Sequence, residues 1–169
     1  MTDDLEFDDD DDDIDLERFL AQQNEIVRGE TVSHIERAMA ELRAGRKRSH
    51  WMWFVFPQCD GVPEYHGRKP SEMTLWFGVA GLPEAEAYLA DETLGARLRD
   101  CFGICLAGEG RDAEAIFGPV DAAKFRACAT LFSRVEGADP VFASVLDAFF
   151  GGEPCPATLA LTAGAACAR

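Results

Sequence analysis

The segment spanning residues 139–152 carries a complete set of helix signals. Asp139-Pro140 places an N-cap carboxylate before a first-turn proline, and Gly151-Gly152 supplies a stop. Between these ends, apolar side chains recur every three or four residues: Phe142, Val145, Leu146 and Phe149. A chain that repeats such segments must bury its apolar stripes by packing helix against helix.

Similar signals recur along the chain. Ser33 and Glu36 fit a capping box, and Gly45 fits the end of that helix. Further helix starts are expected at Asp15, Pro83, Asp112, Asp121 and Pro156. Residues 50–56 and 71–79 fit either strand or buried helix, and residues 59–70 are expected to form a loop. Because clear strand alternation is missing, we predict an all-α, compact single domain of about seven or eight helices.

Most of the excess negative charge lies at the N-terminus. The formal net charge is −15, yet residues 1–15 hold ten acidic and no basic side chains, which leaves 21 acidic against 16 basic residues in the rest. We expect residues 1–14 to be a disordered acidic tail that aids solubility. The alternative is an arm for a basic partner. Nucleic-acid binding is not expected, because phosphate contacts need a basic face.

The cysteines and the hydropathy pattern indicate a reducing compartment. Six cysteines in 169 residues are too few for a disulfide scaffold, and no signal peptide or long apolar run is present. We therefore expect a cytoplasmic protein with no membrane association. Cys101 and Cys105 share a helix face, where buried thiols are favoured over zinc ligands. Neither a metal nor a cofactor is expected.

The densest candidate for a site is the stretch Arg46–Gln58, RKRSHWMWFVFPQ. Its cations can complement the C-terminal end of the preceding helix. His50 can act as a proton acceptor, or it can cap a backbone group beside the core. Trp51 and Trp53 cannot line the same face, so one is expected to be partly exposed, as a stacking platform or as simple packing. Gln58 can contact a polar ligand or satisfy turn carbonyls.

A second candidate cluster contains Lys124 and Arg126. Both lie near the expected start of a helix, where cations are unfavourable unless an anion offsets them. That anion can be an internal carboxylate or a ligand group. Familiar catalytic motifs are missing from the sequence, and nothing in it brings Cys128 and His50 together as a nucleophile and base.

Several segments resemble the bacterial DUF1810 family, whose members are often labelled calpastatin. They are AELRAGRKRSHWMWFVFPQ, EAEAYLADETLGARLRDC, IFG, DAAKFRACATLF and DPVFASVLDAFFGG. The resemblance runs from about Leu16 to Leu161. We divide the chain into an acidic tail (1–14), a DUF1810-like helical domain (15–162) and a frayed C-terminus (163–169). The composition does not resemble that of a disordered, repetitive protease inhibitor.

The resemblance implies a fold in which one central helix is surrounded by the others, and it implies no established activity. It also implies a candidate patch, which comprises Ser49, His50, Trp51, Trp53, Pro57, Gln58, Lys124 and Arg126. This chain departs from the family pattern at Ile35, where the family usually has tyrosine. It also departs at Asp91-Glu92, where the family usually has His-Pro. We interpret Asp91 as a helix cap.

The leading functional hypothesis is a module that binds a small anionic or nucleotide-like ligand, or a peptide. Its ligand-binding residues would be Ser49, His50, Trp51, Trp53, Gln58, Lys124 and Arg126. One alternative is a hydrolase or transferase with His50 as the general base. Another is an adaptor that binds a basic partner through the acidic tail. A monomer is favoured.

Overall fold

The computed structural model describes residues 14–108, 110 and 112–167, with side chains described up to residue 163. The expected acidic tail therefore lies almost wholly outside the described residues. Ten helices and no strand occur in the described part of the chain. The all-α prediction is confirmed, with more helices than the seven or eight expected.

The longer helices begin and end close to the predicted signals. They are α1 (Glu17–Asn24), α2 (His34–Ala44), α6 (Leu82–Ala90), α7 (Glu92–Ala107), α8 (Ala113–Ser133), α9 (Val141–Phe150) and α10 (Pro156–Cys167). The capping box of α2 is confirmed: the Ser33 hydroxyl accepts a hydrogen bond from the Glu36 amide, and the Glu36 carboxylate accepts one from the Ser33 amide. Asp91 caps α7 by accepting from two backbone amides, as interpreted from the sequence.

The three additional helices are short. They are α3 (Met52–Val55), α4 (Val62–Tyr65) and α5 (Glu72–Phe77). Two of them lie in the segments where periodicity could not separate strand from helix. The third, α4, interrupts the expected loop at 59–70. Helices of four to six residues are too short to carry a 3.6-residue period, which explains why the pattern did not predict them.

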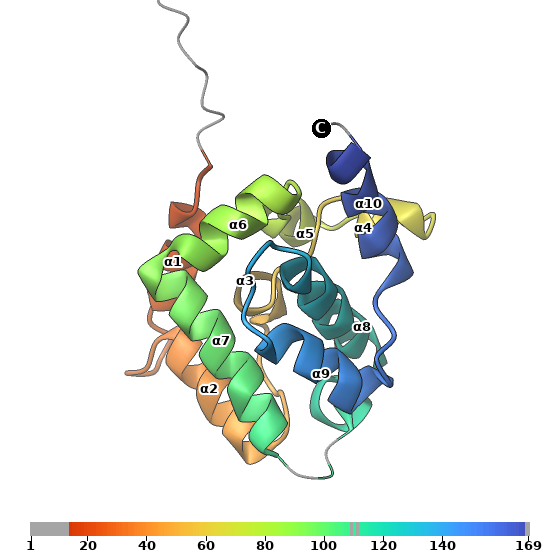
Figure 1. Ribbon diagram of the computed structural model, residues 1–169. Coiled ribbons are helices and arrows are strands. Elements are labelled where there is room, and N and C mark those ends of the chain that lie inside the picture. The colour runs from red at the N-terminus through yellow and green to blue at the C-terminus, as the bar shows by residue number, and fades with distance from the viewer. Residues whose placement is uncertain (1–13, 109, 111, 168–169) are drawn as a thin grey trace, which may run out of the picture.

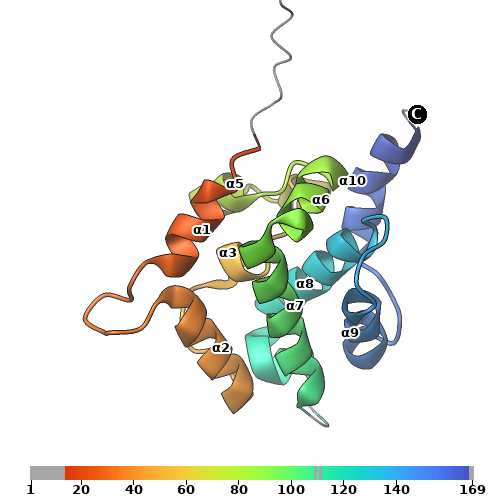
Figure 2. The same cartoon turned by 60° about the vertical axis from the view of Figure 1, so that its left-hand side comes forward.

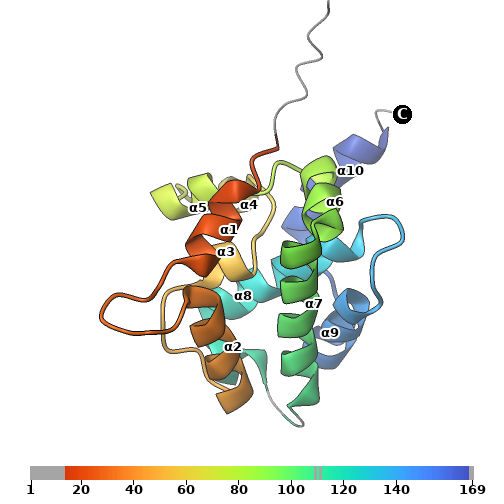
Figure 3. The ribbon, with the colours of Figure 1, turned by 90° about the vertical axis from the view of Figure 1, so that its left-hand side faces the viewer.

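Helix α8 forms the centre of the fold. Residues 127–132 are all buried, which shows that this part of the helix is covered on every side. In Figures 1 and 2, α8 lies in the middle of the surrounding helices, and it packs against α6, α9 and α10. Figure 3 shows α7 running past α8, with α2 beside it. The central helix implied by the family resemblance is thus present.

A kink divides α8 into two parts. Gly118 has φ 78° and ψ 167°, a conformation that side chains with a Cβ rarely adopt, and Pro119 follows it. The break near Gly118 was predicted, but the predicted Asp121 cap is wrong. Pro119 already lies in the first turn after the break, so Asp121 falls within the helix and its carboxylate binds lysines instead.

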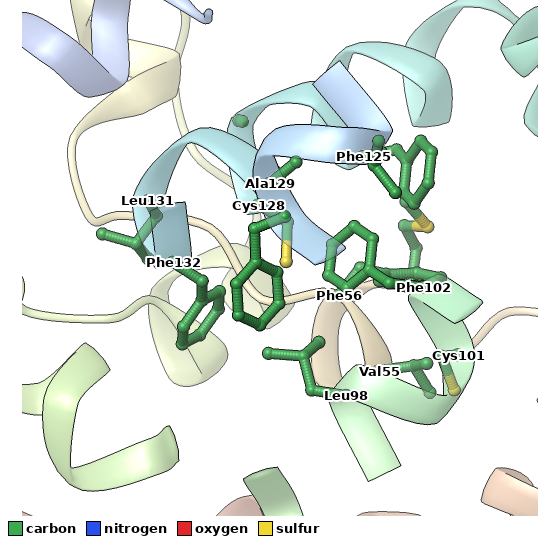
Figure 4. Packing of buried hydrophobic residues seen from close by; sticks show 14 of the residues in the cluster. Val55, Phe56, Leu98, Cys101, Phe102, Phe125, Cys128, Ala129, Leu131 and Phe132 are labelled. Carbon is green, nitrogen blue, oxygen red and sulfur yellow. The ribbon is translucent and has the colours of Figure 1, made fainter. Parts of the chain in front are cut away.

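The core around α8 is rich in phenylalanine. Phe102 and Phe125 stack with their ring centroids 5.2 Å apart, and Phe56 meets both edge-on at 5.1 Å. Figure 4 shows these rings together with Cys128 and Leu98 between α7 and α8. This packing fixes the end of α3 against α8. It thereby sets the position of Trp53 relative to Lys124.

Candidate functional site

Ser49 and Trp51 serve the structure of the stretch between α2 and α3. The buried Glu41 carboxylate of α2 accepts hydrogen bonds from the backbone amides of Arg48 and Ser49, both at 2.6 Å. It also accepts the indole N–H of Trp51 at 3.2 Å, and Trp51 is fully buried. The Trp51 indole and the Ser49 backbone amide are therefore occupied by an internal carboxylate, which was not among the predicted site residues.

His50 stands apart from the other candidates. Its side chain is exposed, and it forms no hydrogen bond or ion pair with another described residue. It neither caps a backbone group nor lines any of the cavities described below. A general base needs a pocket and a second polar group within reach, so this position offers no support for the enzyme alternative.

Trp53, Gln58 and Lys124 meet at one cleft between α3, α5 and α8. The cleft is also lined by Thr74 and Gly78, with the phenylalanine side chains of residues 56 and 77 completing it. The Lys124 ammonium lies 5.0 Å from the centroid of the Trp53 ring, as a cation–π contact. Trp53 is half-buried, and it is the more exposed tryptophan of the pair. The space open to a water-sized group is about 10 Å³.

Asp121 organises the cations beside this cleft. Its carboxylate lies 2.9 Å from the Lys47 ammonium and 3.6 Å from that of Lys124. Both contacts are ion pairs without a hydrogen bond between the side chains, and Lys47 is the closer partner. Lys124 therefore keeps its donors for another acceptor. The pairing of Asp121 with Lys124 follows from their i, i+3 spacing, but the contact with Lys47 depends on the fold.

Two further donors at the cleft have no acceptor within the described residues. The indole N–H of Trp53 is buried and unpaired. The side-chain amide of Gln58 forms no hydrogen bond with another described residue, although its backbone carbonyl accepts from Val79. Buried donors without a partner are rare in proteins, because their desolvation is uncompensated. The Trp53 indole is such a donor, whereas the Gln58 side chain is only half-buried and can donate to a ligand oxygen or to water.

Arg126 does not join this cleft. Its guanidinium donates to the backbone carbonyl of Glu153 at 2.8 Å, lies 3.6 Å from that residue's carboxylate, and lies 5.7 Å from the Phe150 ring centroid. It lines a separate groove of about 680 Å³ that also contains His66 and Arg68. The Glu153 carboxylate thus offsets the charge of Arg126. The sequence left open whether an internal carboxylate or a ligand group would do so.

The buried cysteines are not arranged for catalysis or metal binding. Burial raises the pKa of the Cys128 and Cys101 thiols well above the ordinary value and that of Cys59 to about 11. Cys128 lies fully inside the core, whereas His50 is exposed. Among the residues that the structure describes, no group of three metal-ligating side chains occurs.

Comparisons with known proteins agree with the fold and give no activity. The model of the DUF1810 family, described as a protein of unknown function, matches residues 13–162. The chain therefore belongs to the DUF1810 family. A crystal structure of the conserved hypothetical protein Rv1873 from Mycobacterium tuberculosis is similar, with a TM-score of 0.77 and 40% identity over 89% of this chain and 97% of that one. No curated protein matched the chain.

No helix within residues 14–108, 110 and 112–167 combines the length and the apolar character that crossing a bilayer requires.

Proposed function

We propose that this protein is a binding module that receives an anionic oxygen of its ligand, from a carboxylate or a phosphate, in the cleft between α3, α5 and α8. The observation that carries this proposal is the meeting of Trp53, Gln58 and Lys124. These residues come from separate parts of the chain, and each can donate hydrogen bonds.

The charge of the cleft favours an anion. Lys124 supplies the ammonium, and its partner carboxylate, Asp121, is held more closely by Lys47. The Lys124 side chain is only 22% exposed, so its attraction for a ligand is less screened by water than that of a surface lysine. The ligand oxygen would gain the charge-assisted hydrogen bond that Asp121 does not provide.

The size of the cleft limits what can enter. About 10 Å³ is room for one water-sized group, so a nucleotide base or a sugar does not fit inside. One oxygen of a carboxylate or phosphate fits, and the remainder of the ligand would lie outside. This favours a small metabolite or the carboxylate of a peptide over recognition of a whole nucleotide.

Titration with small anions tests the proposal. Acetate, succinate, inorganic phosphate and AMP are added to the full chain while tryptophan fluorescence is followed. We expect a saturable change with at least one of them, and we expect Trp53→Phe to remove it. Lys124→Met should weaken binding by about 10- to 100-fold, the value of a hydrogen bond to a charged group.

Arg126→Met is the matched control, because this cation lines the other groove. It should leave the affinity unchanged. The proposal fails if no anion gives a saturable response, or if Lys124→Met binds as tightly as the unmodified chain.

A further inference from the structure

A third cavity, of about 470 Å³, lies between α1, α5 and α6, at the point where the described chain begins; we call it the α5 groove. Its apolar lining consists of Ile14, Trp76, Ala80 and Pro83. Its polar lining consists of Asp15, Arg18 and Glu84. It is separate from the Lys124 cleft.

Large apolar side chains are exposed in and beside the groove. The Trp76 side chain is 60% exposed and Ile14 is 42% exposed, while Leu75, next to Trp76 in α5, is 61% exposed. Grouped exposed apolar side chains rimmed by charge mark interaction surfaces, and tryptophan is prominent among the residues that dominate binding energy.

The charge of the groove is negative. Arg18 is fully used within the fold: it pairs with Glu84 at 2.6 Å and donates to the carbonyls of Trp76 and Gly78 at 2.8 and 2.9 Å. Asp15 forms no ion pair with another described residue. The sequence also attaches six consecutive aspartates, Asp8–Asp13, directly to Ile14. The described groove thus carries one acidic side chain without an ion pair, and six aspartates precede it in the sequence.

We infer that the α5 groove binds a short segment of another protein that presents one bulky apolar side chain flanked by lysine or arginine. The apolar side chain would pack on Trp76, and the basic residues would face Asp15, with the negative charge of Asp8–Asp13 adding attraction at longer range. A second copy of this chain fits poorly, because each copy brings the same negative charge to the contact. Anionic membrane surfaces are disfavoured for the same reason.

Selection from a peptide library tests this inference without a known partner. Random dodecapeptides displayed on phage are selected on the full chain and counter-selected on Trp76→Ala. We expect the enriched peptides to combine an apolar anchor with lysine or arginine. Synthetic versions should bind Trp76→Ala at least about 30-fold more weakly, as expected for a dominant tryptophan.

Three variants define the site. Tyr65→Ala removes a similarly exposed aromatic ring from α4, and Lys124→Met alters the other cleft; both should bind the peptides normally. Replacing Asp8–Asp13 by asparagine should weaken binding and reduce its salt dependence.

The inference is overturned if no peptide distinguishes the chain from Trp76→Ala, or if the enriched peptides lack basic residues. It is also overturned if the groove instead mediates a dimer that Trp76→Ala dissociates.

Discussion

Trp51 and Trp53 are two positions apart and have opposite surroundings. Trp51 is enclosed, with its indole N–H bonded to Glu41, whereas the indole N–H of Trp53 has no acceptor within the described residues and its ring lies beside Lys124. Their spacing alone predicts that they do not share a face. It does not predict which one is buried, because that depends on Glu41 of the preceding helix.

Glu41→Gln tests the role of this carboxylate. The carboxylate accepts three hydrogen bonds from the start of the next segment. The amide would place an N–H group against donors and leave at least one of them unsatisfied. We expect the free energy of unfolding in urea to fall by about 2–3 kcal/mol. The exposed Glu86→Gln is the control and should change it little; equal stabilities for both variants would contradict this role.

Among the helices, the kink in α8 is the feature on which the Lys124 cleft depends, because it directs the segment that carries Asp121 and Lys124. Gly118→Ala should lower the free energy of unfolding by about 1–3 kcal/mol, since alanine must adopt a positive φ there. No atom lies within 4 Å of a Cβ added at this position, so the cost is conformational and not steric.

Gly103→Ala provides the matched comparison. It also has open space around an added Cβ, but it lies within the regular helix α7 and its φ is not positive. Here alanine should raise the free energy of unfolding by roughly 0.5–1 kcal/mol through its better helix propensity. Thermal unfolding followed by circular dichroism measures both variants, and a destabilisation of the same size at the two glycines would refute the argument.

The helices themselves were predictable wherever local chemistry marks their ends. Ser33 with Glu36, Asp112 and Gly151 are capping residues as expected. In α9, the Asp139 carboxylate accepts a hydrogen bond from the Val141 amide, and the helix begins one residue later than predicted. The short helices were not predictable, because tertiary packing and not periodicity holds them.

For the molecule as a whole, composition and capping signals predict the fold class, whereas the candidate site depends on contacts between distant segments. Gln58 and Lys124 were both candidates, and the fold brings them together. Arg126, two residues from Lys124, points to a different groove. Thr74 and Gly78 were not singled out, because neither has a sequence signal that relates it to Trp53. Such long-range proximity is decided by packing around α8.

The central claim is that the Lys124 cleft binds an anionic oxygen. It is tested most directly by the indole N–H resonance of Trp53 in a ¹⁵N-labelled chain, assigned with Trp53→Phe, during titration with acetate. We predict that this resonance shifts and saturates while those of Trp51 and Trp76 stay in place, and that Lys124→Met moves the midpoint to about 10- to 100-fold higher acetate. A Trp53 resonance that stays fixed, or one that shifts equally in Lys124→Met, would contradict the claim.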